Sequence, residues 1–91
     1  MSVSVRIPTI LRPYTGGAAE VKTDGGTLTE VIESLEVDHP GIKARVLDDD
    51  GQIRRFVNVY VNDDDVRFAD GLGTATPDGT SISIIPAVAG G

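Results

Sequence analysis

The chain has no cysteine and no tryptophan, and one histidine among its 91 residues. Without cysteine it can form no disulfide, no thiolate metal site and no cysteine nucleophile. Basic residues are also few, with 8 Lys and Arg against 14 Asp and Glu, for a net charge of −6. Nonspecific nucleic-acid binding needs basic clusters that neutralise phosphates. The composition therefore argues against that class of partner.

Long apolar runs are absent as well, and none approaches the length that spans a bilayer. The chain does not open with a charged segment followed by an apolar one, as a leader would. We therefore expect a cytoplasmic protein without a membrane partner. Its length suffices for one compact domain but not two. Because there are only four aromatic residues, the core must consist mostly of Val, Ile and Leu.

Alternating apolar and polar residues predict strands. The pattern is clearest at residues 54–62, where valines occupy every second position. The other expected strands cover residues 2–10, 19–23 and 81–85, with a short one at 66–68. Turn sequences rich in Asp, Gly and Pro separate these segments.

The motif T-L-T-E at residues 27–30 predicts the start of a helix. Thr27 can cap the helix, and Glu30 can reach back to the Thr27 amide. Apolar residues then recur on one helical face, and the helix should end before Pro40. A second, short helical turn is expected at residues 42–47.

This order of elements predicts an α+β fold, with a mixed sheet of four to five strands and one main helix packed on one face. The core should bring apolar strand residues against the apolar face of the helix. The expected core residues are Val3, Val5, Ile7, Leu28, Val31, Ile32, Leu35, Val57, Val59, Val61, Ile82 and Ile84.

Several residues that could carry chemistry have a simpler structural interpretation. His39 lies at the expected helix end, where it can interact with the helix dipole. The aspartate runs at 48–50 and 63–65 do not fit the calcium-loop pattern and are typical of turns. The Gly pairs at 16–17 and 25–26 lack the lysine of a phosphate-binding loop. No metal site is predicted.

The opposite face of the sheet offers a more specific candidate. Phe56 and Tyr60 alternate with the core valines, and they should share this outer face with Asn58 and Ile85. An exposed aromatic and aliphatic patch on a small acidic domain is typical of a protein interface. Alternatively, a loop or a neighbouring strand covers the patch.

The chain ends in a distinctive segment. Pro86 cannot donate a sheet hydrogen bond, so it should end the strand. We expect a domain at residues 1–86 and a flexible tail at 87–91. The tail residues are small or β-branched: Ala87, Val88, Ala89, Gly90 and Gly91. Such a tail could enter a narrow channel of a partner, where the Gly91 carboxylate, unreactive by itself, would be activated.

Three segments carry a resemblance to a known family: I-P-T-I-L-R-P-Y-T-G-G (7–17), R-F-V-N-V-Y-V-N-D-D-D-V-R-F (55–68) and I-I-P-A-V-A-G-G (84–91). With the order of elements, they resemble the ubiquitin-like β-grasp sulfur carriers of the ThiS and MoaD families over nearly the whole chain. The Gly-Gly ending is specific to the wider class, and the other two segments are similar to its CysO-like branch.

The resemblance implies a mechanism. An ATP-dependent enzyme would adenylate the Gly91 carboxylate, and sulfur would then replace AMP to give a thiocarboxylate. In the CysO-like route this sulfur attacks an aminoacrylate on a PLP-dependent cysteine synthase, and a zinc metallopeptidase later releases cysteine. The chain itself would hold no permanent cofactor. It would be a monomeric cosubstrate and not an enzyme.

Other functions remain open at this point. Carriers of this build also supply sulfur to thiosugars and other metabolites. The chain could instead be the small subunit of a molybdopterin synthase, although those subunits often end P-P-V-A-G-G and here Ala87 follows Pro86. It could also be a protein modifier that forms isopeptide bonds through Gly91, or a binding module that uses the outer sheet face.

Overall fold

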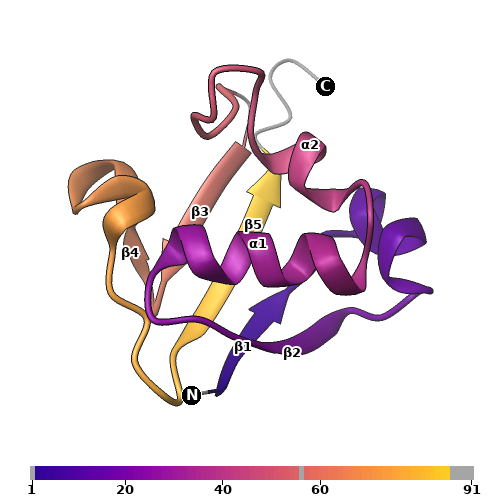
Figure 1. Cartoon of the computed structure of the whole chain (residues 1–91), viewed down its shortest axis with the longest axis horizontal. Helices are drawn as coiled ribbons and strands as arrows, with labels where there is room; N and C mark the ends of the chain where they lie inside the picture. Colours follow the sequence, from indigo (N-terminus) through magenta and orange to yellow (C-terminus); the bar gives the residue numbers. More distant parts are fainter. Residues whose placement is uncertain (1, 56, 87–91) are drawn as a thin grey trace.

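A computed structural model describes residues 2–55 and 57–86 of the chain (Figure 1). Its strands are β1 (Ser2–Arg6), β2 (Glu20–Asp24), β3 (Val57–Val61), β4 (Asp64–Asp65) and β5 (Ser81–Pro86). Its helices are α1 (Leu28–Asp38) and α2 (Ile42–Val46), with three 3-10 helices, η1 (Thr9–Thr15), η2 (Val66–Phe68) and η3 (Gly71–Gly73).

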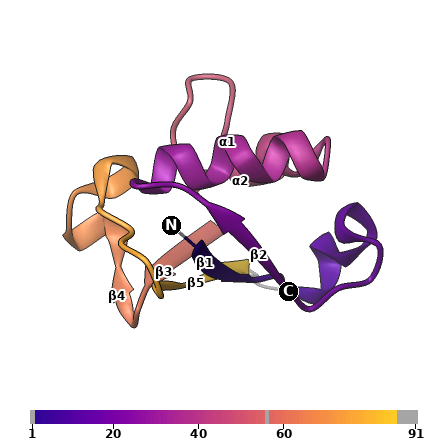
Figure 2. The same ribbon diagram turned by 60° about the horizontal axis from the view of Figure 1, so that its bottom comes forward.

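The strands form one five-stranded mixed sheet in the order β2-β1-β5-β3-β4. β1 and β5 are parallel, whereas the other neighbours are antiparallel. The last strand of the chain is therefore the central strand of the sheet. Both helices lie on the same side of the sheet (Figure 2), so the predicted α+β architecture is confirmed. No helix in this described part is long and apolar enough to cross a bilayer.

Helix α1 begins with the predicted capping box, with one change in the bonding. The Thr27 hydroxyl accepts from the Glu30 amide at 3.3 Å, while the Glu30 carboxylate accepts from the amide of Gly26, at 2.7 Å, and not from that of Thr27. The first bond satisfies an amide that an α-helix leaves free at its start, and the second ties the helix to the turn before it. The helix ends at Asp38, and the next residue, His39, caps it: its amide donates to the Leu35 carbonyl at 2.7 Å. His39 thus has the predicted place at the helix end.

The core forms where the apolar face of α1 meets the inner face of the sheet. All twelve predicted core residues are buried. Burying one Val, Leu or Ile side chain stabilises the fold by roughly 1.5–3 kcal/mol. Five further residues join the core, from η1, α2, the segment after it and η2: Leu11, Ile42, Val46, Leu47 and Val66.

Two predicted strand boundaries are wrong, and so is the predicted short strand. β1 ends at Arg6 and not at residue 10, because Pro8 lacks an amide for the sheet and a 3-10 helix follows. β3 begins at Val57 and not at residue 54. Residues 66–68 form a 3-10 helix, and the short strand precedes it as β4, because the Asp65 carboxylate caps the Arg67 amide at 2.9 Å.

Candidate functional site

The end of β5 is the point from which the tail starts. Pro86 is the last described residue, and it lies opposite Val57 of β3, while Ile85 lies opposite Asn58. On the other side, β1 pairs with β5 only as far as Ser83. The last three residues of β5 are therefore held by β3 alone. The predicted tail at 87–91 lies outside the described residues.

The outer face of the sheet carries the predicted patch in part. Along β3 the valines are buried, while Tyr60 and Asn58 are half-buried and point to the side opposite α1. The Ile85 side chain is 45% exposed. Tyr60 lies opposite Ser83, so Ile85 is its diagonal neighbour, within reach of a long side chain. Phe56 lies outside the described residues. The structure thus brings Tyr60 and Ile85 together on one surface.

Arg67 braces the start of β3, next to the end of β5. Its guanidinium donates to the Asn58 side-chain oxygen at 2.7 Å and to the Val57 carbonyl at 2.6 Å. It also donates to the carbonyls of Arg54, at 2.9 Å, and Arg55, at 3.3 Å. One planar fork of donors can hold several acceptors in this way. Arg67 therefore fixes the segment against which the last residues of β5 pair.

Two exposed apolar side chains were missed by the sequence interpretation. Ile10 is 67% exposed on η1, and Phe68 is 90% exposed on η2. Ile10 lies in a segment predicted to be a strand, and only Pro8 signals that the strand ends earlier. Phe68 lies in a predicted short strand that is in fact a 3-10 helix. Both side chains enlarge the apolar surface available to a partner.

The aspartate runs have the structural role predicted for them. The Asp48 carboxylate accepts from the amides of Asp50, at 2.9 Å, and Gln52, at 3.0 Å. Asp65 caps η2, and Asn62 and Asp63 adopt positive φ in the turn between β3 and β4. Within the described residues, no group of three His, Cys, Asp or Glu side chains is arranged to hold a metal ion.

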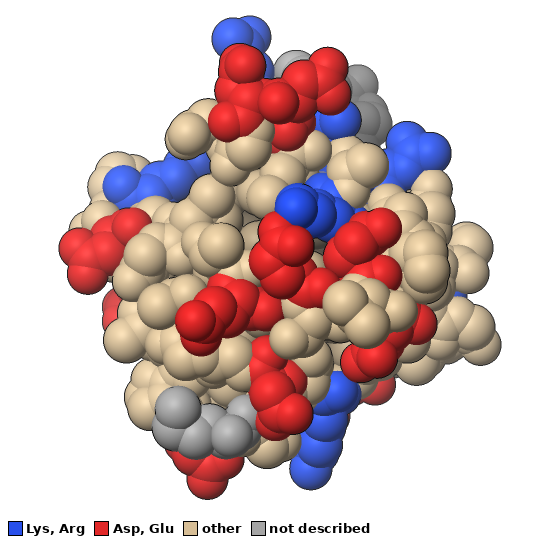
Figure 3. All heavy atoms as spheres, viewed as in Figure 1, with Lys and Arg blue, Asp and Glu red and all other residues tan. Residues whose placement is uncertain are grey.

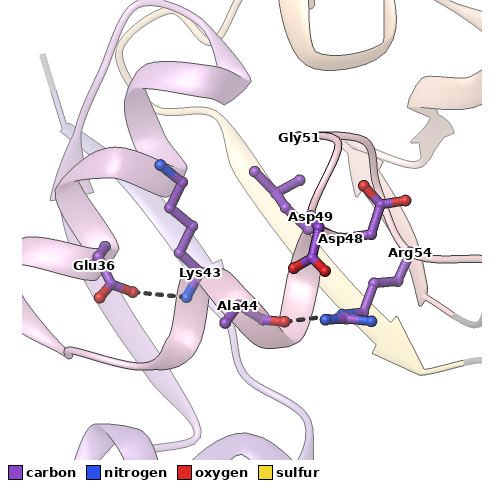
Figure 4. A pocket seen from close by; sticks show the side chains of 8 residues that line it. Glu36, Lys43, Ala44, Asp48, Asp49, Gly51 and Arg54 are labelled. Carbon is purple, nitrogen blue, oxygen red and sulfur yellow. Dashed lines mark hydrogen bonds between the residues drawn. The ribbon is translucent and has the colours of Figure 1, made fainter.

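A hollow of about 480 Å³ between α2 and the loop after it contains several charged groups (Figure 4). The Glu36 carboxylate accepts from the amides of Gly41, at 3.1 Å, and Lys43, at 2.9 Å. These bonds, strongest for the charged form, lower the pKa of Glu36 below its ordinary value. Arg54 donates through Nε to the Ala44 carbonyl at 2.8 Å. The two side chains thus hold α2 and its loop in place.

The fold defines a class of protein before any relative is considered. A mixed sheet with both helices on one side, whose central strand is the last one described, is that of a ubiquitin-like β-grasp protein. Two solved structures agree. One chain of the crystal structure of the Amycolatopsis orientalis BexX/CysO complex matches with a TM-score of 0.92 at 52% identity, over 98% of this chain and 99% of that one. The crystal structure of Mycobacterium tuberculosis CysO matches with a TM-score of 0.91 at 55% identity, over 94% and 99%.

The particular family follows from sequence comparison. Residues 5–91 match the ThiS family, and the chain belongs to it. It is 56% identical to the sulfur carrier protein CysO of Mycobacterium tuberculosis strain H37Rv, with 100% of both chains covered. It is also 40% identical to small archaeal modifier protein 3 of Haloferax volcanii, over 75% of this chain and 73% of that one. The predicted family and the β-grasp fold are confirmed.

Proposed function

We propose that the chain carries sulfur as a thiocarboxylate on Gly91. The broader class of function is confirmed: the full-length likeness to sulfur carrier protein CysO makes this ThiS-family chain a sulfur carrier, a protein cosubstrate and not a catalyst. The observation that supports the site is that this likeness includes the tail, because the family match runs to residue 91. The position of β5 adds a physical reason, since the described chain ends on the central strand of the sheet, directly before the proposed tail.

The chemistry at Gly91 requires activation from outside. A carboxylate is a poor acyl donor, so an ATP-dependent enzyme would couple it to the α-phosphate of ATP and release pyrophosphate. A sulfur nucleophile then attacks the acyl carbon, AMP leaves, and the thiocarboxylate remains. The activating enzyme holds the ATP, and because ATP is consumed, the proposal assigns the carrier to the cytoplasm. The small residues Ala87, Val88, Ala89 and Gly90, following Pro86, would let a narrow channel close around the tail.

The acceptor in this proposal is a PLP-dependent cysteine synthase. The thiocarboxylate sulfur attacks an aminoacrylate held by that enzyme, and an acyl shift to nitrogen leaves cysteine attached to Gly91. A zinc metallopeptidase would release the amino acid and restore the carrier. Incubating the thiocarboxylate form with such a synthase and its serine-derived substrate should add one cysteine residue to the C-terminal peptide. An unchanged peptide would favour another acceptor, such as a thiosugar synthase.

The terminal position of the carboxylate can be tested by extending the chain. A variant with one alanine appended after Gly91 moves the carboxylate by one residue, whereas a variant with one alanine added before Met1 keeps it in place. Both are incubated with ATP, sulfide and an activating enzyme, and the intact mass is measured. We expect oxygen-for-sulfur replacement in the N-terminally extended control and its loss in the C-terminally extended variant. Equal conversion of the two would rule out Gly91.

We further propose that the outer face, with Phe56, Tyr60 and Ile85, docks on the activating enzyme. Ile85→Asp places a charge at the centre of this surface, so the KM for the carrier should rise by about tenfold while kcat is kept. Phe56→Asp should act in the same direction. Val37→Asp is the matched control, because Val37 is 79% exposed but lies on α1, on the opposite side of the sheet. A KM for Ile85→Asp equal to that of the control would put the interface elsewhere.

A protein modifier is the second candidate, favoured by the 40% identity to small archaeal modifier protein 3. In that role the activated Gly91 would form an isopeptide bond with a lysine of another protein. Extracts of the source cell should then contain conjugates of higher mass that disappear when Gly91 is deleted. Thiocarboxylate formation without such conjugates would favour the carrier role alone.

A further inference from the structure

A basic groove adjoins the end of β5. It has a volume of about 410 Å³ and lies between the end of β1, η1 and the end of β5. Among the described residues that line it, most are apolar and none is acidic. The lining residues are Arg6, Ile7, Pro8, Thr9, Ile10, Arg12, Ile84 and Ile85.

The two arginines of the basic groove are oriented but not neutralised. Arg12 donates through Nε to the Ile7 carbonyl at 3.2 Å, which leaves its terminal nitrogens for another acceptor. Arg6 is exposed at the last position of β1. Glu20 lies opposite Arg6 on β2, yet within residues 2–55 and 57–86 neither arginine is in an ion pair. Both guanidiniums can therefore bind a carboxylate without breaking an existing pair.

The groove contrasts with the charge of the rest of the molecule. The chain carries a net charge of −6. Acidic side chains gather over α1 (Figure 3), and this helix contains four acidic residues and no basic one. An acidic partner surface would be repelled by α1 and attracted by the groove. This asymmetry would turn the end of β5 toward the partner during encounter.

The groove is also continuous with the face proposed to dock. Ile85 belongs to both, and the exposed Ile10 lines the groove together with it. Because β1 pairs with β5 only to Ser83, the groove lies along the part of β5 that β1 leaves unpaired. An apolar side chain of a partner can thus fill the groove while a neighbouring carboxylate reaches the arginines.

We propose that the basic groove binds an acidic loop of the activating enzyme, one that presents an Asp or Glu beside an apolar side chain. The inference rests on the proposed function, because it names the partner chemistry at the same end of the molecule. The carboxylate pairs with Arg6 or Arg12, and the apolar side chain packs between Ile10 and Ile85. Arginine suits this role because its planar fork pairs with both carboxylate oxygens.

The test compares charge reversals on one face of the sheet. The variants are Arg6→Glu and the double variant Arg6→Glu with Arg12→Glu, and the control is Lys22→Glu. Lys22 is exposed on the same face, on the edge strand β2, and does not line the groove. AMP release by the activating enzyme gives kcat and KM for each variant at low and high salt, and circular dichroism checks the fold.

We expect the KM of the double variant to rise by about tenfold or more at low salt, with kcat unchanged and the salt dependence of KM largely lost. Arg6→Glu, which breaks no hydrogen bond of the structure, should show a smaller rise in the same direction, and Lys22→Glu less than a twofold change. Groove variants that match the control would overturn the inference. A lower KM in the double variant would also overturn it. That result would mean that the groove of the wild-type chain binds the carrier's own carboxylate and not one of the enzyme. If the activating enzyme releases no AMP even with the wild-type chain, the proposed function itself is wrong, and not only the inference about the groove.

Discussion

At the scale of single residues, Glu36 shows how a side chain can replace a missing cap. Helix α2 starts at Ile42, and its N-cap residue Gly41 has no side chain to satisfy the first amides. The carboxylate of Glu36 accepts from two of these amides, although it comes from the preceding helix. The sequence did not reveal this role, because the partners are five and seven residues away and no capping motif has that spacing.

Glu36 gives a prediction on pH dependence. The pKa of Glu36 is lower in the folded chain than its ordinary value of 4.5. At a pH near 4.5 the unfolded chain therefore binds more protons than the folded chain. Stability from this group is therefore present at neutral pH and is lost as the pH falls through the folded pKa. Glu36→Gln should lower the free energy of unfolding in urea at pH 7, and the difference from wild type should shrink at pH 3.

The control for this prediction is Glu20→Gln, which removes an exposed carboxylate that caps no amide in the described part of the chain. A difference between Glu36→Gln and wild type that stays constant from pH 7 to pH 3 would show that the charge of Glu36 does not stabilise α2.

Asp63 is strained, with φ at 107° in the turn between β3 and β4. Glycine adopts such a conformation without steric cost. Asp63→Gly should therefore raise the free energy of unfolding by about 0.5–1 kcal/mol, the strain relieved exceeding the entropy that glycine adds to the unfolded chain. Asp63→Ala keeps a Cβ and should give no gain. Equal changes in the free energy of unfolding for the two substitutions, measured in urea, would contradict the presence of backbone strain at Asp63.

At the scale of elements, the sequence predicts the strands and α1 well where periodicity is strong. The valines of β3, the capping box of α1 and the core face of β5 all lie where their patterns place them. The failures occur where local bonding ends a pattern early. Pro8 ends β1 although apolar residues recur as far as Ile10, and residues 66–68 form a 3-10 helix that Asp65 caps. Alternation alone cannot show either event.

The sequence likewise predicts only part of the candidate site. The shared face of Tyr60 and Ile85 follows from alternation, because residues two apart in a strand point to one side. The groove formed by η1 and β5 does not follow, since Ile10 and Ile85 are 75 positions apart in the sequence. Arg67 is missed for a different reason: three of its acceptors are backbone carbonyls before and at the start of β3, which no side-chain pattern marks.

Arg67 leads to a prediction for the sheet around the end of β5. Arg67→Ala removes four hydrogen bonds at the start of β3 and should lower the free energy of unfolding by about 1–3 kcal/mol. Amide exchange should accelerate most in β3 and at Ile85, whose partner strand loses its brace. Arg6→Ala, at an exposed site without a bonded partner in the described residues, should change the stability by less than about 0.5 kcal/mol. Uniform exchange changes across the sheet would argue against a local brace.

At the scale of the whole molecule, the topology and the charge distribution both distinguish the end of β5 from the rest of the surface. The last described strand, β5, occupies the centre of the sheet, and the sequence continues from its end at Pro86 to Gly91. The acidic surface gathers over α1, on one side of that sheet (Figure 3). The basic groove adjoins the end of β5. A partner that receives the tail would thus meet an apolar and basic surface first. Such an arrangement would suit the proposed role, in which each partner enzyme binds the carrier by the same end.

The central claim is that Gly91 carries the sulfur, and the intact mass of the protein tests it most directly. The protein is purified from sulfur-replete source cells and measured before and after incubation with ATP, sulfide and an activating enzyme proven on another carrier. The account predicts a gain equal to one oxygen replaced by one sulfur, located by fragmentation in the C-terminal peptide. An unchanged mass under both conditions, or a gain located anywhere else in the chain, would contradict it.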